Sequence, residues 1–285
     1  MNYLVYIATL VSIIACKTAD EEISAGSLVS RVQFTSVDGV LLEGTLELPT
    51  LKGSHPLVVF VHGSGQRTRS DYQEIVNLLL PNGFAVFRYD KRGVGASQGV
   101  YSGVSAKNSS SLIPLLAADA AAAVNQVKEN MSIDPHRVIL IGASQAGWII
   151  PAVEASTDIS LTVCISGPAV SIGEEIYYSN LAETGSYPQD QADQMLASFS
   201  GMKGYDPISY IAIMQNPSLW IFGGKDVSIP IKRTLELLDS IKTNNGIPIE
   251  IKLYPNADHG IFNITTRKLE DYLAPMFEWL TNHSK

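Results

Sequence analysis

The chain has 285 residues, of which 46% are hydrophobic and 17% charged, so it is long enough for one large domain with a sizeable core and too apolar for a disordered protein. Its formal net charge is -8 and no basic stripe runs along it, which argues against nucleic acid as a partner. Its two cysteines, Cys16 and Cys164, exclude a disulfide framework and a zinc site built on cysteine.

The N-terminal residues predict an export signal. An apolar run over residues 3–15 is too short to span a bilayer, and Cys16 followed by KTADEE comes directly after it. The residues IIAC resemble a bacterial lipobox, although no Lys or Arg precedes the run. We expect a lipoprotein-type signal peptide at residues 1–15 and export to the bacterial cell envelope, where acyl chains on Cys16 attach the protein to a membrane. Cleavage without lipidation and a buried N-terminal helix are the alternatives.

A hairpin is the first predicted element of the folded domain. A flexible linker is expected over residues 16–28, and the domain itself over residues 29–285. Two segments of alternating polarity, SLVSRVQF and VLLEGTLELP, lie on either side of a turn at Asp38-Gly39. This arrangement predicts two antiparallel strands.

Short apolar runs follow the hairpin, and helical patterns separate most of them. The runs, in chain order, are PLVVFVHG, GFAVFRYD, HRVILIGAS, SLTVCISG, PSLWIFGG and PIEIKLYP. The helical segments are DYQEIVNLLL, LLAADAAAAVNQVKEN, a segment beginning at Ser144, IPIKRTLELLDSIK and RKLEDYLAPMFEWL. This alternation predicts an α/β fold with a mostly parallel sheet, helices on both faces and a ligand site at the carboxyl ends of the strands. The stretch 167–216 is too long for a bare connection and predicts a small helical cap.

A serine, Ser144, lies where a predicted strand turns into a helix. The sequence IGASQAGWI is close to the Gly-x-Ser-x-Gly pattern, in which a sharp turn exposes a nucleophilic hydroxyl and small neighbours relieve the crowding. Gly142 is present, whereas Ala146 stands at the last position and Gly147 follows one residue later. Ser144 is therefore a candidate nucleophile, and the alternative is an ordinary helix cap.

Catalysis by serine also needs a base and a carboxylate that orients the base. Among the five histidines, His259 follows the last predicted strand in the loop NADHG, from which it can reach the other strand ends. Asp226, which lies in GGKD after the preceding strand, is the candidate carboxylate. Asp258 is the alternative, but it directly precedes His259 in the chain, and side chains at adjacent positions diverge. The chain order Ser144, Asp226, His259 is the order expected on a parallel sheet of this kind.

The loop HGSG after the first parallel strand predicts an oxyanion hole. The expected donors are the backbone N–H of Gln145, which follows the candidate nucleophile, and that of Ser64, with Gly65 as the alternative to Ser64. We expect His62 to support this loop. The stretch GVGASQG at residues 93–99 has its last glycine one position late for a dinucleotide fingerprint, so no nucleotide site is expected there.

With VHGSG, RYDKRGVGAS, IGASQAGW, GGKD and NADHG in this order, the chain resembles the α/β-hydrolase superfamily, and within it the bacterial esterases and serine-aminopeptidase-like hydrolases that carry an HGSG loop. The resemblance covers about residues 30–283. It implies an α/β-hydrolase fold and these roles: nucleophile Ser144, acid Asp226, base His259, and oxyanion donors Ser64 and Gln145. Asp90, Arg92 and Ser97 match a loop of the family that is structural.

We expect a carboxylesterase that acts through an acyl-enzyme on small to medium esters, without a metal ion or an organic cofactor. A peptidase of the same fold, aminopeptidase or prolyl-oligopeptidase-like, and an acyl thioesterase are alternatives, because they share the catalytic groups. An acidic pair in the cap that binds a free amino terminus would favour a peptidase, and Glu174 and Glu175 are candidates for it. A non-catalytic binding protein is a further alternative, against which the complete set of catalytic residues argues. The expected partner is thus a small-molecule ester or a short peptide.

Overall fold

The computed structural model describes residues 22–24 and 27–284 of the chain. The expected signal peptide and Cys16 lie outside these residues. Within them, no helix is both long enough and apolar enough to cross a membrane.

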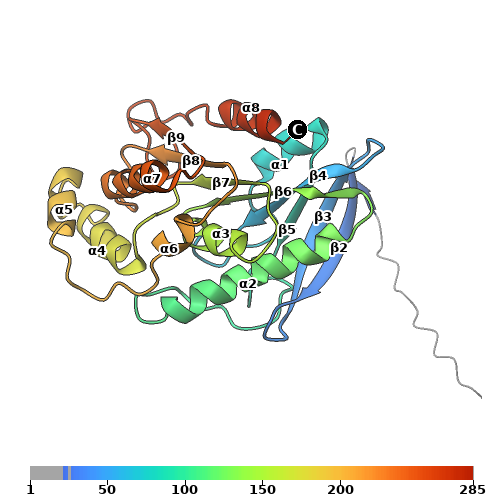
Figure 1. The fold of residues 1–285 in the computed structure, drawn as a ribbon, viewed down its shortest axis with the longest axis horizontal. Coiled ribbons are helices and arrows are strands. Elements are labelled where there is room, and N and C mark those ends of the chain that lie inside the picture. Colours follow the sequence, from blue (N-terminus) through green and yellow to red (C-terminus); the bar gives the residue numbers. More distant parts are fainter. Residues whose placement is uncertain (1–21, 25–26, 285) are drawn as a thin grey trace, which may run out of the picture.

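The described residues form a nine-stranded sheet in the order β1-β2-β3-β5-β4-β6-β7-β8-β9 (Figure 1). Strands β1, β2, β3 and β5 pair antiparallel in this order, and all pairs from β5 to β9 are parallel. The predicted hairpin and the predicted mostly parallel sheet are therefore confirmed. The strands are β1 (Glu22–Ser24), β2 (Ser27–Thr35), β3 (Leu41–Pro49), β4 (His55–Val61), β5 (Ala85–Tyr89), β6 (Ile133–Ala143), β7 (Leu161–Ile165), β8 (Ser218–Gly223) and β9 (Ile249–Tyr254).

Helices cover both faces of this sheet (Figure 1). One face carries α1 (Gln73–Leu79), which continues into a 3-10 turn at Leu80–Asn82, and α8 (Leu273–His283). The other face carries α2 (Ser109–Lys128), α3 (Ala146–Glu154) and α7 (Ile231–Asn245). The central strands thus lie between two helix layers.

Side chains of the central strands alternate between two cores. In β4, Leu57, Val59 and Val61 pack with α2, whereas Val58 and Phe60 pack with α1 and α8. All five side chains are inaccessible to solvent, as expected for a parallel strand that is covered on both sides. This packing holds the strand ends rigidly, so the loops that follow them start from fixed positions.

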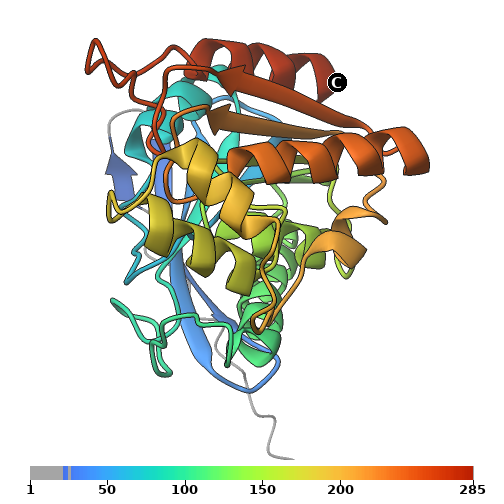
Figure 2. The ribbon, with the colours of Figure 1, turned by 90° about the vertical axis from the view of Figure 1, so that its left-hand side faces the viewer.

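Helices occupy the segment between β7 and β8, where the sequence predicts a cap. They are α4 (Ile172–Ala182), α5 (Gln189–Leu196) and α6 (Ile208–Ile211). Helices α4 and α5 share a small apolar cluster of their own and lie together beyond the ends of the strands (Figure 2). Helix α4 therefore comes to lie over the carboxyl ends of the parallel strands.

Parts of the structure differ from the predictions. Strand β1 and the start of β2 lie within residues 16–28, where a flexible linker is expected. Strand β1 spans 3 residues at the edge of the sheet, which is too short to show a pattern of alternation. The last helical pattern begins at Arg267, but the chain first forms a bridge between Phe262 and Leu269 and becomes helical only at Leu273.

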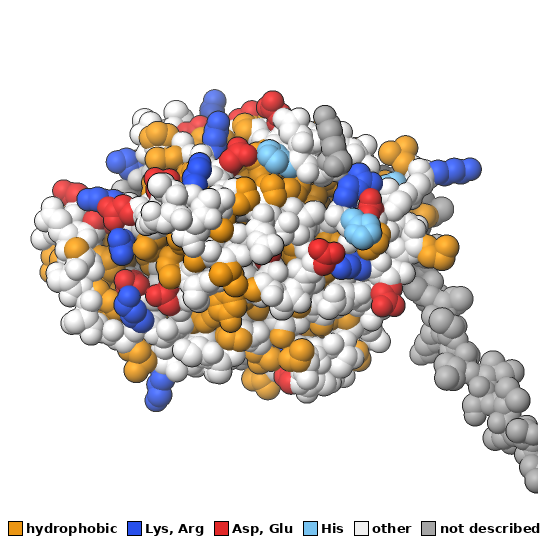
Figure 3. All heavy atoms as spheres, in the orientation of Figure 1, with side chains coloured by type: hydrophobic (Ala, Val, Ile, Leu, Met, Phe, Trp, Pro, Cys, Tyr) orange, Lys and Arg blue, Asp and Glu red, His pale blue; other side chains and the backbone are white. Residues whose placement is uncertain are grey.

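The loop after β5 is held by a cluster of ion pairs. The guanidinium of Arg92 contacts Asp119 of α2 at 2.5 Å and Asp38 of the hairpin turn at 2.7 Å. The hydroxyl of Ser97 donates to the carbonyl of Asp90 at 2.6 Å, so the loop also folds onto itself. These contacts fit the structural role that the resemblance implies for this loop. On the face seen in Figure 3, the cationic and anionic side chains are interspersed.

Candidate active site

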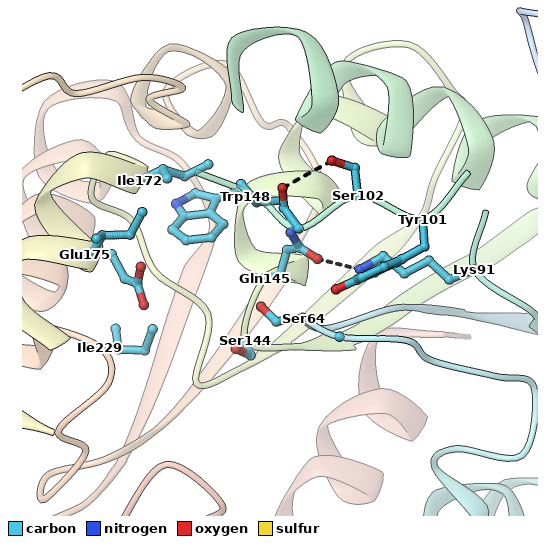
Figure 4. A pocket seen from close by; sticks show the side chains of 14 residues that line it. Ser64, Lys91, Tyr101, Ser102, Ser144, Gln145, Trp148, Ile172, Glu175 and Ile229 are labelled. Carbon is cyan, nitrogen blue, oxygen red and sulfur yellow. Dashed lines mark hydrogen bonds between the residues drawn. The ribbon is translucent and has the colours of Figure 1, made fainter. Parts of the chain in front are cut away.

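A cavity of about 250 Å³ lies at the carboxyl ends of the parallel strands. Its wall is built from loops that follow neighbouring strands, and it is partly covered by α4 (Figure 4). The loops contribute Ser64 after β4, Lys91 after β5, Ser144 after β6 and Ile229 after β8, and Ile172 lies at the start of α4. Ligands of parallel α/β sheets bind in this position.

Ser144 lies in a strained turn between β6 and α3. Its φ is 56°, in the left-handed region that serine rarely adopts. Its backbone N–H donates to the carbonyl of Ile165 at 2.8 Å, and its own carbonyl accepts the N–H of Gly147 at 2.9 Å. The N-cap of α3 is Gln145, and Ser144 Oγ has no hydrogen-bond partner among the described residues. The structure therefore presents the hydroxyl to the cavity and does not use it as a helix cap.

Small residues around this turn explain why Ala146 is accommodated. A Cβ on Gly142 would lie 2.4 Å from the Cβ of Ala146 and 2.6 Å from the carbonyl oxygen of Val61. A Cβ on Gly147 would lie 2.6 Å from the backbone of Gly167. Glycine is needed at these two positions, because β6 lies very close to β4 and to the start of α3 at Gly142, and α3 lies very close to the loop after β7 at Gly147. With Gly142 in place, the methyl group of Ala146 fits and is fully buried.

Asp226 and His259 form a direct contact. His259 Nδ1 lies 2.7 Å from Oδ2 of Asp226, which is fully buried. The other carboxylate oxygen accepts the backbone N–H groups of Ser228 at 2.8 Å and Ile229 at 2.9 Å. The carboxylate is therefore fixed, and Nδ1 of His259 serves as the donor to it. This leaves Nε2 of His259 for another partner.

Close packing of the loops after β8 and β9 brings this pair together. A Cβ on Gly223 would lie 2.1 Å from the carbonyl oxygen of Asp258, so the two loops approach this closely only with glycine there. The carboxylate of Asp258 accepts the N–H of Gly260 at 3.0 Å within its own turn and is not bonded to His259. The hydroxyl of Ser166, after β7, donates to the carbonyl of His259 at 2.8 Å. Ser166 therefore anchors the histidine to the end of β7.

Among the described contacts, no hydrogen bond joins Ser144 Oγ to His259. The two residues are connected through the end of β7, where Ile165 accepts the N–H of Ser144 and Ser166 holds the carbonyl of His259. Hydrogen bonds between a nucleophile and its base are often long in the free enzyme and shorten when substrate binds. The structure thus places Asp226 and His259 in contact, and Ser144 at the end of β6, which β7 separates from β8.

Carboxylates around His259 raise its pKa. Burial acts in the opposite direction, but the hydrogen bond and charge of Asp226, followed by the charges of Glu175 and Glu183, hold the pKa above its ordinary value of 6.5. Burial also raises the pKa of Glu175 to about 7, with Glu183 and Asp226 acting in the same direction and His259 opposing them. His259 and Glu175 therefore influence each other electrostatically.

Glu174 and Glu175 do not act as a pair. Glu174 forms a capping box with Ser171 at the start of α4, and its carboxylate lies 3.7 Å from Lys203. Glu175 instead points into the cavity (Figure 4). Its carboxylate has no hydrogen-bond or salt-bridge partner among the described residues. One acid is thus available to a ligand, where the sequence suggested two.

The HGSG loop lies against the turn at Ser144. A Cβ on Gly63 would lie 3.7 Å from the Cβ of Ser144, which shows how near the two loops are. His62 is 2% exposed, and its Nε2 donates to the carbonyl of Tyr89. Burial lowers the pKa of His62 to about 4, so the ring is neutral at ordinary pH. His62 therefore supports the loop from below and does not reach the cavity.

Lys91 connects the two residues expected to donate to an oxyanion. Its Nζ donates to the carbonyl of Gly63, which precedes Ser64, at 2.9 Å and to Oε1 of Gln145 at 2.6 Å (Figure 4). Ser64 and Gln145 line the same cavity. Lys91 is not among the residues that the sequence predicts for the site. Its position directly after the run GFAVFRYD, at the carboxyl end of a parallel strand, is the signal by which it can be found.

The part of the chain that the structure describes holds no group of three or more His, Cys, Asp or Glu side chains that could bind a metal ion. The polar groups of the cavity include Ser64, Lys91, Ser144, Gln145 and Glu175.

Comparison with known sequences finds a family match. The model of the prolyl oligopeptidase family matches residues 70–285. The chain is 24% identical over 263 residues to the acylamino-acid-releasing enzyme of Rattus norvegicus. The alignment covers 89% of this chain and 35% of that enzyme. The chain thus spans only 35% of the length of this curated relative.

Comparison with solved structures finds esterases. An esterase of Pyrococcus furiosus superposes with a TM-score of 0.68 at 21% identity, covering 90% of this chain and 92% of that one. Acetyl xylan esterase 1 from Thermoanaerobacterium sp. superposes with a TM-score of 0.68 at 18% identity, covering 94% of this chain and 87% of that one. These similarities confirm the predicted α/β-hydrolase fold.

We predict that Gly142→Ala destabilises the protein. The added methyl group must displace Ala146 or the backbone of β4, and overpacking of this kind typically costs about 1–3 kcal/mol. Thermal unfolding should show a Tm several degrees below that of the wild type, and the double variant Gly142→Ala with Ala146→Gly should recover part of the loss. Gly103→Ala is the matched control, because a Cβ there has no atom within 4 Å. An unchanged Tm for Gly142→Ala would contradict the close packing of Gly142 against Ala146 and Val61.

Proposed function

Since the chain belongs to the prolyl oligopeptidase family, a family of serine hydrolases, we propose that it is a carboxylesterase that forms an acyl-enzyme on Ser144. One observation carries this proposal: the buried Asp226 is hydrogen-bonded to His259, and Ser144 stands in a strained turn at the same edge of the sheet with no hydrogen-bond partner for its hydroxyl among the described residues. An oriented histidine and an exposed serine hydroxyl are the groups that nucleophilic acyl transfer needs.

The proposed reaction begins when Nε2 of His259 takes the proton of Ser144 and Oγ attacks the carbonyl carbon of the ester. Asp226 holds Nδ1 in place and stabilises the imidazolium that forms. The backbone N–H groups of Ser64 and Gln145 donate to the oxyanion. His259 then passes its proton to the leaving alcohol, which departs and leaves the acyl-enzyme. A water molecule, deprotonated by His259, attacks the acyl carbonyl and releases the acid and the free serine.

The size and lining of the cavity favour a small ester. Its volume is about 250 Å³, and the apolar side chains of Trp148, Ile172, Ile176 and Ile229 contribute to its wall. An apolar wall of this kind suits a short acyl group, whereas a long chain needs more room. The similarity to an acetyl xylan esterase, whose acyl group is short, supports this size.

A peptidase is the second candidate, and Glu175 is the observation that favours it. The carboxylate of Glu175 faces the cavity without a salt-bridge partner among the described residues, so it suits the ammonium group of a free amino terminus. The names of the family and of the rat relative also support a peptidase. An acyl thioesterase would use the same catalytic groups, and no observation favours it.

Ester hydrolysis that depends on Ser144 is the direct test of the proposed function. We predict that a fluorophosphonate probe labels the wild-type protein and that p-nitrophenyl acetate is hydrolysed faster than esters of long acyl chains, because the cavity is small. Ser144→Ala should abolish labelling and lower kcat by at least about 10⁴-fold, as expected for loss of a nucleophile. Aminoacyl-p-nitroanilides, assayed in parallel, measure the peptidase candidate.

The outcomes separate the candidates. Turnover of the anilides without turnover of the esters would replace the carboxylesterase with the peptidase. Absence of labelling in the wild type, or equal labelling of Ser144→Ala, would show that the protein is not a serine hydrolase acting through this residue.

The pH dependence of activity tests the contact between Glu175 and His259. His259 acts as a base only when neutral, so its raised pKa predicts that kcat/KM falls as the pH drops below neutrality. Glu175→Gln removes one of the charges that raise this pKa, and the acid side of the profile should therefore move to lower pH. Glu129→Gln, at the exposed end of α2, is the control and should leave the profile in place. An unmoved profile in Glu175→Gln would refute the electrostatic coupling.

We also propose that the protein is exported and anchored to a membrane through acyl chains on Cys16. The apolar run over residues 3–15 and the IIAC sequence support this location. Mass spectrometry of the membrane fraction of a producing bacterium should find the mature chain beginning at a lipid-modified Cys16, and Cys16→Ser should release the protein from that fraction. A mature N-terminus without lipid would refute the anchor.

A further inference from the structure

We propose that Lys91 is the positioning residue of the oxyanion hole, and that its ammonium group holds the peptide that carries the Ser64 N–H and the side chain of Gln145, the residue that carries the second donor. This inference rests on the proposed acyl-transfer function. It follows from the place of Lys91 after β5, which pairs with β4, while β6 pairs with the other side of β4. The loops after β4 and β6 carry the two expected donors, so one side chain from β5 reaches both.

The first hydrogen bond of Lys91 acts on the peptide between Gly63 and Ser64. Nζ donates to the Gly63 carbonyl at 2.9 Å. Because a trans peptide is planar, its carbonyl and its N–H point in opposite directions, so a bond to the Gly63 oxygen fixes the direction of the Ser64 N–H. A cationic donor on the carbonyl also polarises the amide and strengthens its N–H as a donor. Arg67 Nε donates to the carbonyl of Ser64 at 2.8 Å and holds the next peptide in the same loop.

The second hydrogen bond holds the other donor residue. Nζ donates to Oε1 of Gln145 at 2.6 Å. Gln145 is 2% exposed, and its side chain has no other hydrogen bond to the described residues. The ammonium of Lys91 thus ties the start of α3 to the HGSG loop, and the two donors keep a fixed separation.

The charge of Lys91 has no ion-pair partner within residues 22–24 and 27–284. Lys91 is 4% exposed, and no carboxylate among the described residues forms a salt bridge with it. The ring of Tyr101 lies 5.9 Å from Nζ. Asp90 and Arg92, which flank Lys91 in the sequence, both have ion-pair partners of opposite charge. A buried charge without such a partner is less stable than an apolar side chain of the same size, so its presence beside the cavity points to a role in the site.

Deprotonation of Lys91 is accessible to experiment. Burial, and then the charge of Arg67, lower the pKa of Lys91 to about 8. The other groups around it are His62, which is neutral because its pKa is about 4, the ring of Tyr101, and Glu175 across the cavity. Above about pH 8 the ammonium becomes a neutral amine, its two hydrogen bonds lose their charge assistance, and the positive charge beside the oxyanion disappears. Activity is therefore expected to decline on the alkaline side.

The test compares Lys91→Met and Lys91→Arg with the wild type, using p-nitrophenyl acetate as substrate and a phenylboronic acid as a tetrahedral inhibitor. Lys91→Met should lower kcat by about 10–100-fold with KM within about twofold, since loss of one oxyanion donor itself costs about 10²–10³. The affinity of Lys91→Met for the boronic acid should fall by the same factor as its kcat. Lys91→Arg keeps the charge and the capacity to donate twice, so it should recover most of the activity. Since a guanidinium stays protonated, the activity of Lys91→Arg should not decline above about pH 8.

Controls distinguish this role from a structural one. Lys107→Met makes the same substitution at an exposed lysine and should behave as wild type. Thermal unfolding of Lys91→Met should show a Tm equal to or above that of the wild type, because a buried charge is removed. Wild-type kcat in Lys91→Met, or the same alkaline decline in Lys91→Arg, would overturn the inference and leave the proposed function intact. If the wild type shows neither ester turnover nor fluorophosphonate labelling, the proposed function falls, and the inference with it.

Discussion

The hydrogen bond between Asp226 and His259 is the interaction on which the geometry of the site depends. A carboxylate that is fully buried is tolerated only when its oxygen atoms are satisfied. Two backbone N–H groups bind one oxygen of Asp226, and the imidazole binds the other. These bonds fix the loop after β8, and the glycine at position 223 lets the loop after β9 pack against it. The direction of the histidine is therefore set by the requirement to satisfy one buried acid.

The turn at Ser144 depends on a second constraint: the residues packed around it must have small side chains. A serine in the left-handed region is strained by about 1–3 kcal/mol, and surrounding contacts must hold it. The bond from its N–H to Ile165 supplies one such contact, and the close approach of α3 at Gly142 and Gly147 supplies the rest. Space for a methyl group remains at Ala146. The Gly-x-Ser-x-Gly pattern thus reflects the small volume that is available around the serine. This sequence satisfies that requirement with Ala146 at the usual glycine position and Gly147 one residue later.

The sequence predicted those features that depend on local chemistry. The strands, the hairpin and the position of Ser144 follow from hydrophobic runs and from the turn residues that end them. Asp226 and His259 could be chosen because few acids and histidines follow strand ends. Contacts across the sheet were not predictable in the same way: Lys91 bonds to loops that lie 28 and 54 residues away in the chain. The separate roles of Glu174 and Glu175 depend on where α4 begins, because its capping box engages only the first of them. Strand β1 is too short to leave a pattern.

The charges around Ser144 are arranged to match those that develop in the proposed reaction. Lys91 and Glu175 lie on opposite sides of Ser144 in the cavity (Figure 4). Attack by the serine creates a negative oxygen on the side of Ser64 and Gln145, which Lys91 connects, and a positive imidazolium on the side of Asp226 and Glu175. A site that carries fixed charges of the opposite sign at both places needs little reorganisation during the reaction. The buried lysine and the raised pKa of the histidine are therefore two parts of one electrostatic arrangement.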